Sequence, residues 1–138
     1  MSRPLIVLTA VVALTGCDRP DESLRARQMA SRALRNVLAY PQSTLVRVAA
    51  GENAAEIVLT SPAPVPVIVA WYRQTFALNQ WELKSEQERH DTVTLFAERR
   101  GEPVWIRLYP NSGAPGTTYT LVGAILPDSV TTDSTPVR

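Results

Sequence analysis

Apolar residues recur at helical spacing in two stretches of the chain, which predicts two helices. The first covers residues 23–40, where Ser23 suits the cap position and Pro41 follows the end. The second covers residues 65–78, because proline is tolerated in the first turn of a helix and Asn79 offers a left-handed stop. Its predicted buried stripe consists of Val65, Ile68, Val69, Tyr72 and Phe76.

Elsewhere the apolar period changes to two, which is the period of a strand. Residues 45–49 and 56–60 predict a hairpin around the polar segment 50–54. Four alternating runs follow the second helix and are separated by short turns; they cover residues 81–87, 92–98, 104–109 and 117–126. In the first of these runs the predicted inward residues are Trp81 and Leu83, and the predicted outward residues are Glu82, Lys84 and Glu86.

This order of elements predicts an α+β fold. Consecutive strands joined by short turns favour antiparallel pairing, with helices on one face of the sheet. We expect a mostly antiparallel sheet of about five to six strands, with one central helix packed on it and an N-terminal helix before it. The α+β domain is expected to span residues 41–127, and residues 128–138, which lack an apolar period, are expected to be a disordered tail.

The predicted first helix is amphipathic and has two interpretations. Leu24, Leu34 and Leu38 lie on its apolar side, whereas Arg25 and Arg32 lie on the other. An apolar stripe usually faces a core, which favours packing on the domain. Alternatively, the arginines contact anionic lipid headgroups beside a membrane.

The N-terminus has the pattern of an export signal. Arg3 provides a positive start, and residues 4–16 form an apolar run. A membrane span needs roughly 20 apolar residues, so this run is too short to be a permanent anchor. It ends at Cys17, which is the only cysteine of the chain.

The sequence Leu-Thr-Gly-Cys at residues 14–17 resembles the lipobox of bacterial prolipoproteins. The resemblance implies that residues 1–16 are a lipoprotein signal peptide and that the sulfur of Cys17 receives a diacylglycerol. Residues 17–40 would then comprise the lipid anchor, a short tether and the amphipathic helix.

The same resemblance predicts where the protein resides. A lipidated Cys17 would hold it on a membrane, facing the periplasm of a bacterial envelope. Asp18 directly after the cysteine is similar to an inner-membrane retention signal of enterobacterial lipoproteins. We expect the inner membrane if Asp18 acts in this way, and otherwise the outer membrane.

Composition narrows the range of partners. The chain of 138 residues has 14 basic and 13 acidic residues, which gives a formal net charge of +1 at pH 7. A near-neutral domain has no long-range field to gather nucleic acid, and an export route argues against meeting any. With Cys17 lipidated, no second thiol is left to form a disulfide.

Residues with catalytic chemistry are sparse. His90, the only histidine, lies between Arg89 and Asp91 at a predicted hairpin tip, where solvent surrounds it. A zinc site would need several His, Cys or carboxylate ligands at close spacing. The carboxylates of Glu82 and Glu86 are separated by a lysine, and such alternating charge is typical of a solvated face. We therefore expect no enzymatic activity, no cofactor and no metal site.

The loop at residues 111–116 is rich in glycine but lacks the glycine spacing and the lysine of a phosphate-binding loop. It joins two predicted strands. A hairpin connection therefore accounts for it.

A cluster of residues on one sheet face is the candidate binding face. If the apolar residues of 104–109 meet the helices, alternation turns Trp105, Arg107 and Tyr109 away from them, and Phe96 shares their face. These residue types dominate interface hot spots. Two other interpretations are cross-strand pairing without any ligand, and coverage of this face by the helix at residues 23–40.

The stretch from Val69 to Leu83, VAWYRQTFALNQWEL, resembles one that recurs in small bacterial envelope lipoproteins. In those proteins a helix with aromatic residues and an arginine precedes a strand that contains tryptophan. The resemblance implies no particular activity, and its aromatic residues have the character of packing residues.

Together these patterns predict a lipid-anchored envelope protein that acts as a non-catalytic interaction or binding module, with another envelope protein as its candidate partner. One alternative is a passive structural lipoprotein that associates with the wall or membrane. The other is a small envelope hydrolase, which the lack of a nucleophile–base pair disfavours.

Overall fold

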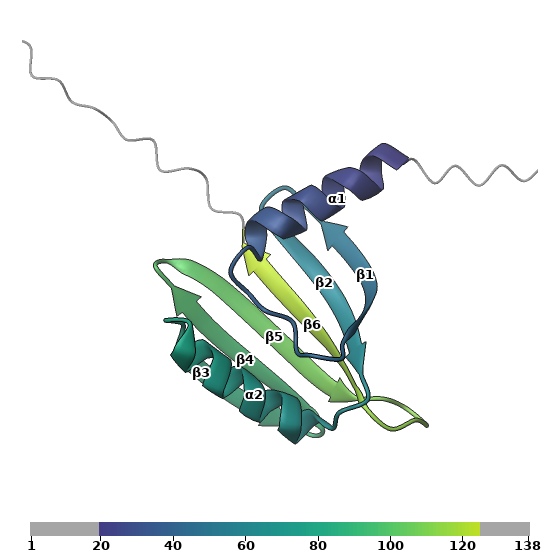
Figure 1. Cartoon of the computed structure of the whole chain (residues 1–138), viewed down its shortest axis with the longest axis vertical. Coiled ribbons are helices and arrows are strands. Elements are labelled where there is room, and N and C mark those ends of the chain that lie inside the picture. Colours follow the sequence, from purple (N-terminus) through teal and green to yellow (C-terminus); the bar gives the residue numbers. More distant parts are fainter. Residues whose placement is uncertain (1–19, 125–138) are drawn as a thin grey trace, which may run out of the picture.

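In the computed structural model, which describes residues 20–124, six strands form one antiparallel sheet with two helices on one of its faces (Figure 1). The elements are α1 (Pro20–Ala33), β1 (Thr44–Ala50), β2 (Ala54–Ser61), α2 (Val65–Leu78), β3 (Glu82–Arg89), β4 (Thr92–Arg99), β5 (Glu102–Pro110) and β6 (Thr117–Ala124). The predicted α+β fold class is confirmed. The predicted signal peptide at residues 1–16, Cys17, Asp18 and the predicted tail at residues 128–138 lie outside the described residues.

The strands are ordered β1-β2-β6-β5-β4-β3 across the sheet. β1 and β2 form the predicted hairpin, and α2 then carries the chain to the opposite edge. From there β3, β4, β5 and β6 form the predicted meander, which returns until β6 pairs with β2. The antiparallel sheet is therefore continuous, with β1 and β3 as its two edge strands.

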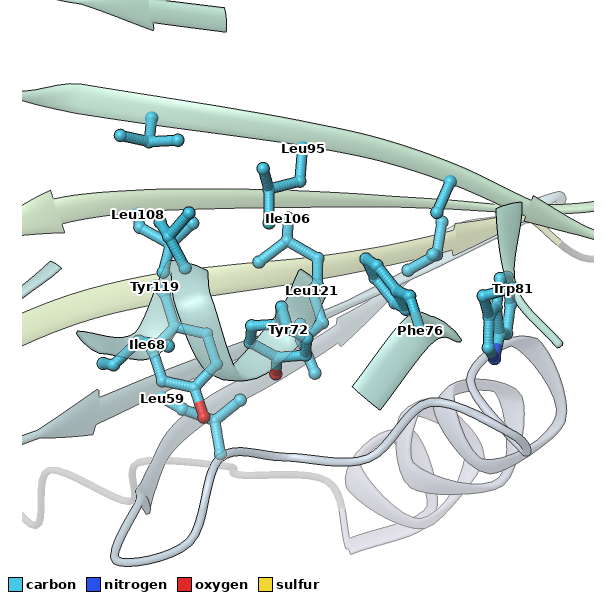
Figure 2. Packing of buried hydrophobic residues seen from close by; sticks show 14 of the residues in the cluster. Leu59, Ile68, Tyr72, Phe76, Trp81, Leu95, Ile106, Leu108, Tyr119 and Leu121 are labelled. Carbon is cyan, nitrogen blue, oxygen red and sulfur yellow. The ribbon is translucent and has the colours of Figure 1, made fainter. Parts of the chain in front are cut away.

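The core lies between α2 and the middle of the sheet (Figure 2). α2 occupies the predicted residues 65–78, and the side chains of Ile68, Tyr72 and Phe76 are buried. They face apolar side chains from the central strands, which are Leu95, Ile106, Leu108, Tyr119 and Leu121. Fully burying a large apolar side chain is worth about 1.5–3 kcal/mol, so this layer supplies much of the stability.

The first helix ends earlier than its sequence predicts. α1 spans Pro20–Ala33, whereas the pattern predicted a helix to Tyr40. Backbone groups of the following segment bond instead to side chains of the core: Trp81 Nε1 donates to the Asn36 carbonyl at 3.3 Å, and Tyr72 Oη donates to the Leu38 carbonyl at 3.0 Å. The prediction was wrong because these distant partners outweigh local helical preference.

α1 packs on the same face of the sheet as α2. Ala30 and Leu34 are buried, and Leu34 belongs to the core. The end of the helix comes so close to β6 that a Cβ on Gly123 would lie 2.5 Å from the Ala33 carbonyl oxygen. The first half of the helix is exposed, and Leu24 there is 54 % exposed. Packing on the domain, the first of the two interpretations, therefore describes the second half of α1.

Both edge strands contain a β-bulge. In β1 the register shifts between Leu45 and Arg47, and in β3 it shifts between Leu83 and Ser85. One extra residue reverses the alternation of side chains beyond it. Glu86 consequently pairs with an inward residue of β4 and lies on the helix face, so its predicted outward orientation was wrong.

The end of α2 also differs in detail. Asn79 follows the helix as predicted, but its φ is −108°, and Gln80 is the residue with positive φ, at 61°. The Asn79 side chain instead donates from Nδ2 to the Thr75 carbonyl at 2.8 Å. The Asn79 side chain therefore satisfies a backbone carbonyl of the last turn of α2, and the residue with a left-handed backbone is Gln80, one position later.

Substitution of Trp81 tests the assignment of the core. Trp81 is 7 % exposed and packs against Phe76, so Trp81→Ala should lower the free energy of unfolding by about 3–5 kcal/mol. Trp105→Ala is the matched control, because Trp105 is 40 % exposed on the other face and should cost about 1–2 kcal/mol. Urea unfolding of both variants measures the difference, and equal losses would contradict the assignment of faces.

Candidate functional site

A pocket of about 730 Å³ opens at the end of the sheet where α2 begins. Its walls come from the β2–α2 linker, the first turns of α2, the facing ends of β3 and β4, and the β5–β6 loop. The lining residues are Pro62, Pro64, Val65, Pro66, Val69, Arg73, Glu86, Glu88, Asp91, Val93, Pro110, Ala114, Pro115 and Gly116. The volume lies within the usual range for small-molecule sites, which is roughly 300–1,000 Å³.

Two buried hydroxyl groups fix the linker wall of the pocket. The backbone N–H of Ala63 donates to Ser61 Oγ at 3.3 Å, and Thr117 Oγ1 donates to the Ala63 carbonyl at 2.7 Å. Ser61 and Thr117 are both buried. The two hydroxyls therefore satisfy both backbone groups of Ala63, which lies between the lining residues Pro62 and Pro64.

The β5–β6 loop forms the adjoining wall and is held by Asn111. The backbone N–H of Asn111 donates to the Gly116 carbonyl at 3.0 Å, and its side-chain Nδ2 donates to the Pro115 carbonyl at 3.3 Å. Thr118 Oγ1 donates to Asn111 Oδ1 at 2.7 Å. The loop that the sequence explains as a hairpin connection is therefore also an ordered wall of the pocket.

Gly116 lies where the β5–β6 loop meets the β2–α2 linker. Its φ is +106°, and a Cβ at this position would clash with the carbonyl oxygen of Ser61. Only glycine accommodates both the left-handed backbone and the close approach.

The pocket is mainly apolar inside and charged at one side. Val69 and Val93 are buried lining residues, and prolines from both walls add rigid apolar surface. Arg73 of α2 is paired with Glu86 of β3, with Nε donating to Oε2 at 2.9 Å and Nη2 contacting Oε1. Hydrogen bonding to this arginine holds the pKa of Glu86 below its usual value, so the carboxylate stays ionised at neutral pH.

Sequence reasoning did not find this pocket. It predicted Glu86 on a solvated outer face, and only the bulge in β3 turns Glu86 and Glu88 toward α2. The dense prolines at residues 62–66 are the signal that could have marked a rigid, irregular wall.

The four residues of the candidate binding face lie on the sheet face that faces away from the helices. Phe96 of β4 and Trp105 of β5 are register partners on the face away from the helices, and their rings stack with centroids 5.1 Å apart and planes at 20°. Arg107 and Tyr109 follow Trp105 at alternate positions of β5, and both are exposed. We call these four residues the outer aromatic face.

Coverage of the outer aromatic face by the first helix was a wrong interpretation. α1 lies on the other face, where Leu34 joins the core. Trp105 and Tyr109 remain 40 % and 39 % exposed. Cross-strand packing and partner binding remain as interpretations of this face.

The residues considered for catalysis do not lie together at one site. His90 is exposed in the β3–β4 turn, with φ of 54°, as the hairpin prediction implied. Glu82 pairs with Lys84 at 2.8 Å on the surface. Within residues 20–124 no three His, Cys, Asp or Glu side chains are grouped so that they could hold a metal ion.

A family model described as START domain-like matches residues 41–118, which is more than half of the chain. The chain belongs to the START domain-like family. No curated protein and no solved structure matches it. The START domain-like region runs from just before β1 into β6 and therefore includes every lining residue of the pocket, from Pro62 to Gly116.

The START domain-like match begins after α1 and after Cys17, so it bears on the sheet and pocket and not on the lipobox. Within the part of the chain that the structure describes, no helix is both long and apolar enough to cross a membrane.

Removal of one hydroxyl tests the linker wall. Thr117→Val keeps the shape of a fully buried side chain but leaves the Ala63 carbonyl without this donor, which should lower the free energy of unfolding by about 1–3 kcal/mol. Thr120→Val is the control, because Thr120 is half-buried on the outer face of the same strand and should change stability by less than about 0.5 kcal/mol. Thermal or urea unfolding of both variants gives the comparison, and a loss in Thr117→Val no larger than the control would contradict the role of the bond.

Proposed function

We propose that this protein is a non-catalytic binding module that takes a small ligand with an apolar body into the pocket beside the start of α2. The observation that carries the proposal is the pocket itself: about 730 Å³, apolar inside, and walled by segments that hydrogen bonds hold in place. Membership of the START domain-like family supports a ligand-binding role. Preformed walls favour binding because little order has to be imposed when the ligand enters.

The residues that line the pocket are suited to hold a ligand by apolar contact and to orient it by polar contact. Valines and prolines make apolar contact, and the polar groups lie at one side, which is the usual composition of a site that orients a ligand without reacting with it. The lining contains no Ser, Cys, Thr, Lys or His side chain. Its carboxylates, which could also act as nucleophile or base, are exposed to solvent, and that of Glu86 is engaged by Arg73. These features support a binding role over a small envelope hydrolase.

The same proposal includes a membrane anchor at Cys17. The lipobox-like sequence supports lipidation of this residue, and the domain would then face the periplasm, on the inner membrane if Asp18 acts as a retention signal. A ligand-binding domain held in this way differs from a passive structural lipoprotein, because it requires a pocket with preserved walls.

A protein partner on the outer aromatic face is a second candidate function. The observation that favours it is a stacked Phe96–Trp105 pair, beside an exposed arginine and tyrosine, that no described element covers. The Trp105→Ala variant also tests this second candidate function. Crosslinking of the variant in the native envelope should no longer capture a partner that binds the outer aromatic face, while the variant itself remains folded.

Filling the pocket tests the main proposal. Val65 lines the pocket at the first position of α2, so Val65→Trp should weaken binding of the neutral fluorescent probe N-phenyl-1-naphthylamine by about tenfold or more. Val67→Trp is the matched control, because Val67 is on the same helix, is 46 % exposed and is not a lining residue. Probe fluorescence measures binding and circular dichroism confirms folding. Equal binding by wild type and Val65→Trp would refute the pocket as the site.

Loss of the sulfur tests the anchor. Cys17→Ser removes the acceptor of the diacylglycerol, and since the chain has no other cysteine, incorporation of a palmitate analogue should fall to background. In cell fractionation the variant should leave the membrane pellet. Label on Cys17→Ser at the wild-type level would refute the anchor without affecting the pocket proposal.

A further inference from the structure

We infer that the ligand of the pocket carries a positively charged nitrogen, with a primary aliphatic ammonium group as the chemistry that fits best. This inference rests on the proposed function, since it assigns the chemical class of the ligand to the same pocket. It follows from the charges that remain uncompensated in the lining and from where the fold places them.

The lining has one arginine and three carboxylates, so it holds two more negative than positive formal charges. Arg73 is already engaged, because its guanidinium forms two contacts with the carboxylate of Glu86. The side-chain carboxylates of Glu88 and Asp91 form no ion pair or hydrogen bond with other residues of the described range 20–124. These two carboxylates are therefore the free charges of the pocket.

The bulge in β3 is the reason that this side of the pocket carries negative charge. Beyond it, Glu88 pairs with Val93, a buried residue of the pocket lining, and so lies on the helix face. Arg89, the next residue, alternates to the outer face of the sheet. Without the bulge the arginine would face the pocket and the glutamate would face away.

This placement favours an amphiphile with a cationic end. The apolar body of such a ligand would lie on Val69 and Val93, and its charged end would lie beside Glu88 and Asp91. An anionic end would meet two unpaired carboxylates at the same place. Opposite charges attract at this range and like charges repel, so the pocket discriminates by sign.

The lining also discriminates between kinds of cation. It contains no Phe, Tyr or Trp side chain, so it offers no aromatic cage for a quaternary ammonium ion. A primary ammonium group carries three N–H donors, which carboxylate oxygens accept in short, charge-assisted hydrogen bonds. We therefore expect a primary ammonium to bind better than its trimethylated counterpart.

A matched ligand series tests the inference. Displacement of N-phenyl-1-naphthylamine from the full chain would be measured at pH 7 with octylammonium, octyltrimethylammonium, 1-octanol and octanoate. Octylammonium should bind about fivefold tighter than 1-octanol, with octanoate weaker than both, because two exposed carboxylates each contribute a small attraction. The preference should shrink between about 20 and 200 mM salt, since exposed charges are screened.

Variants separate the charge from the pocket. Glu88→Gln combined with Asp91→Asn should abolish the preference for octylammonium and leave the affinity for 1-octanol unchanged. Glu102→Gln is the control, because Glu102 is an exposed acid at the opposite end of the sheet and should preserve the preference. Binding of 1-octanol with no preference for octylammonium, or a preference that survives the double substitution, overturns the inference and leaves the proposed function intact. Failure of every probe to bind overturns the proposed function itself.

Discussion

The fold depends on three aromatic side chains that hold the segment between α1 and β1. Trp81 and Tyr72 donate to backbone carbonyls of this segment, and the Tyr119 hydroxyl accepts from the Tyr40 N–H at 3.1 Å and contacts Ser43 Oγ at 2.6 Å. Burial raises the pKa of Tyr72 far above its usual value, so this phenol remains a neutral donor. Each of these polar atoms would cost stability if left unpaired inside the core. The interactions therefore join the segment after α1 both to α2 and to the meander.

The regular parts of the fold could be predicted because they follow local patterns. The helical stripe of α2 and the alternation of β4 and β5 give both the elements and their buried faces, including the outer aromatic face around Trp105. The end of α1 could not be predicted in this way. Its cause is a set of bonds from residues that are 34 to 79 positions away in sequence, which no local pattern records.

The pocket could not be predicted for a related reason. It is assembled from three separated segments, and its charges depend on the single extra residue in β3, which reverses the orientation of Glu86 and Glu88. From the sequence those acids look like the solvated side of a regular strand. The need for glycine at position 116 likewise becomes evident only in the folded protein, where the carbonyl oxygen of Ser61 lies beside it. By contrast, the lipobox-like sequence at Cys17 can be read without any fold, because a signal of that kind is a linear stretch of residues.

The bulges in β1 and β3 have a consequence for how copies of the protein behave near one another. These strands form both free edges of the sheet, and a flat edge with unpaired backbone groups invites another molecule to add a strand. β1 would be the more adhesive edge, since Leu45 and Val46 are 52 % and 60 % exposed, whereas β3 carries alternating charges. An irregular register on each edge discourages such pairing. Copies of the protein at high local concentration therefore have less tendency to aggregate through their sheets.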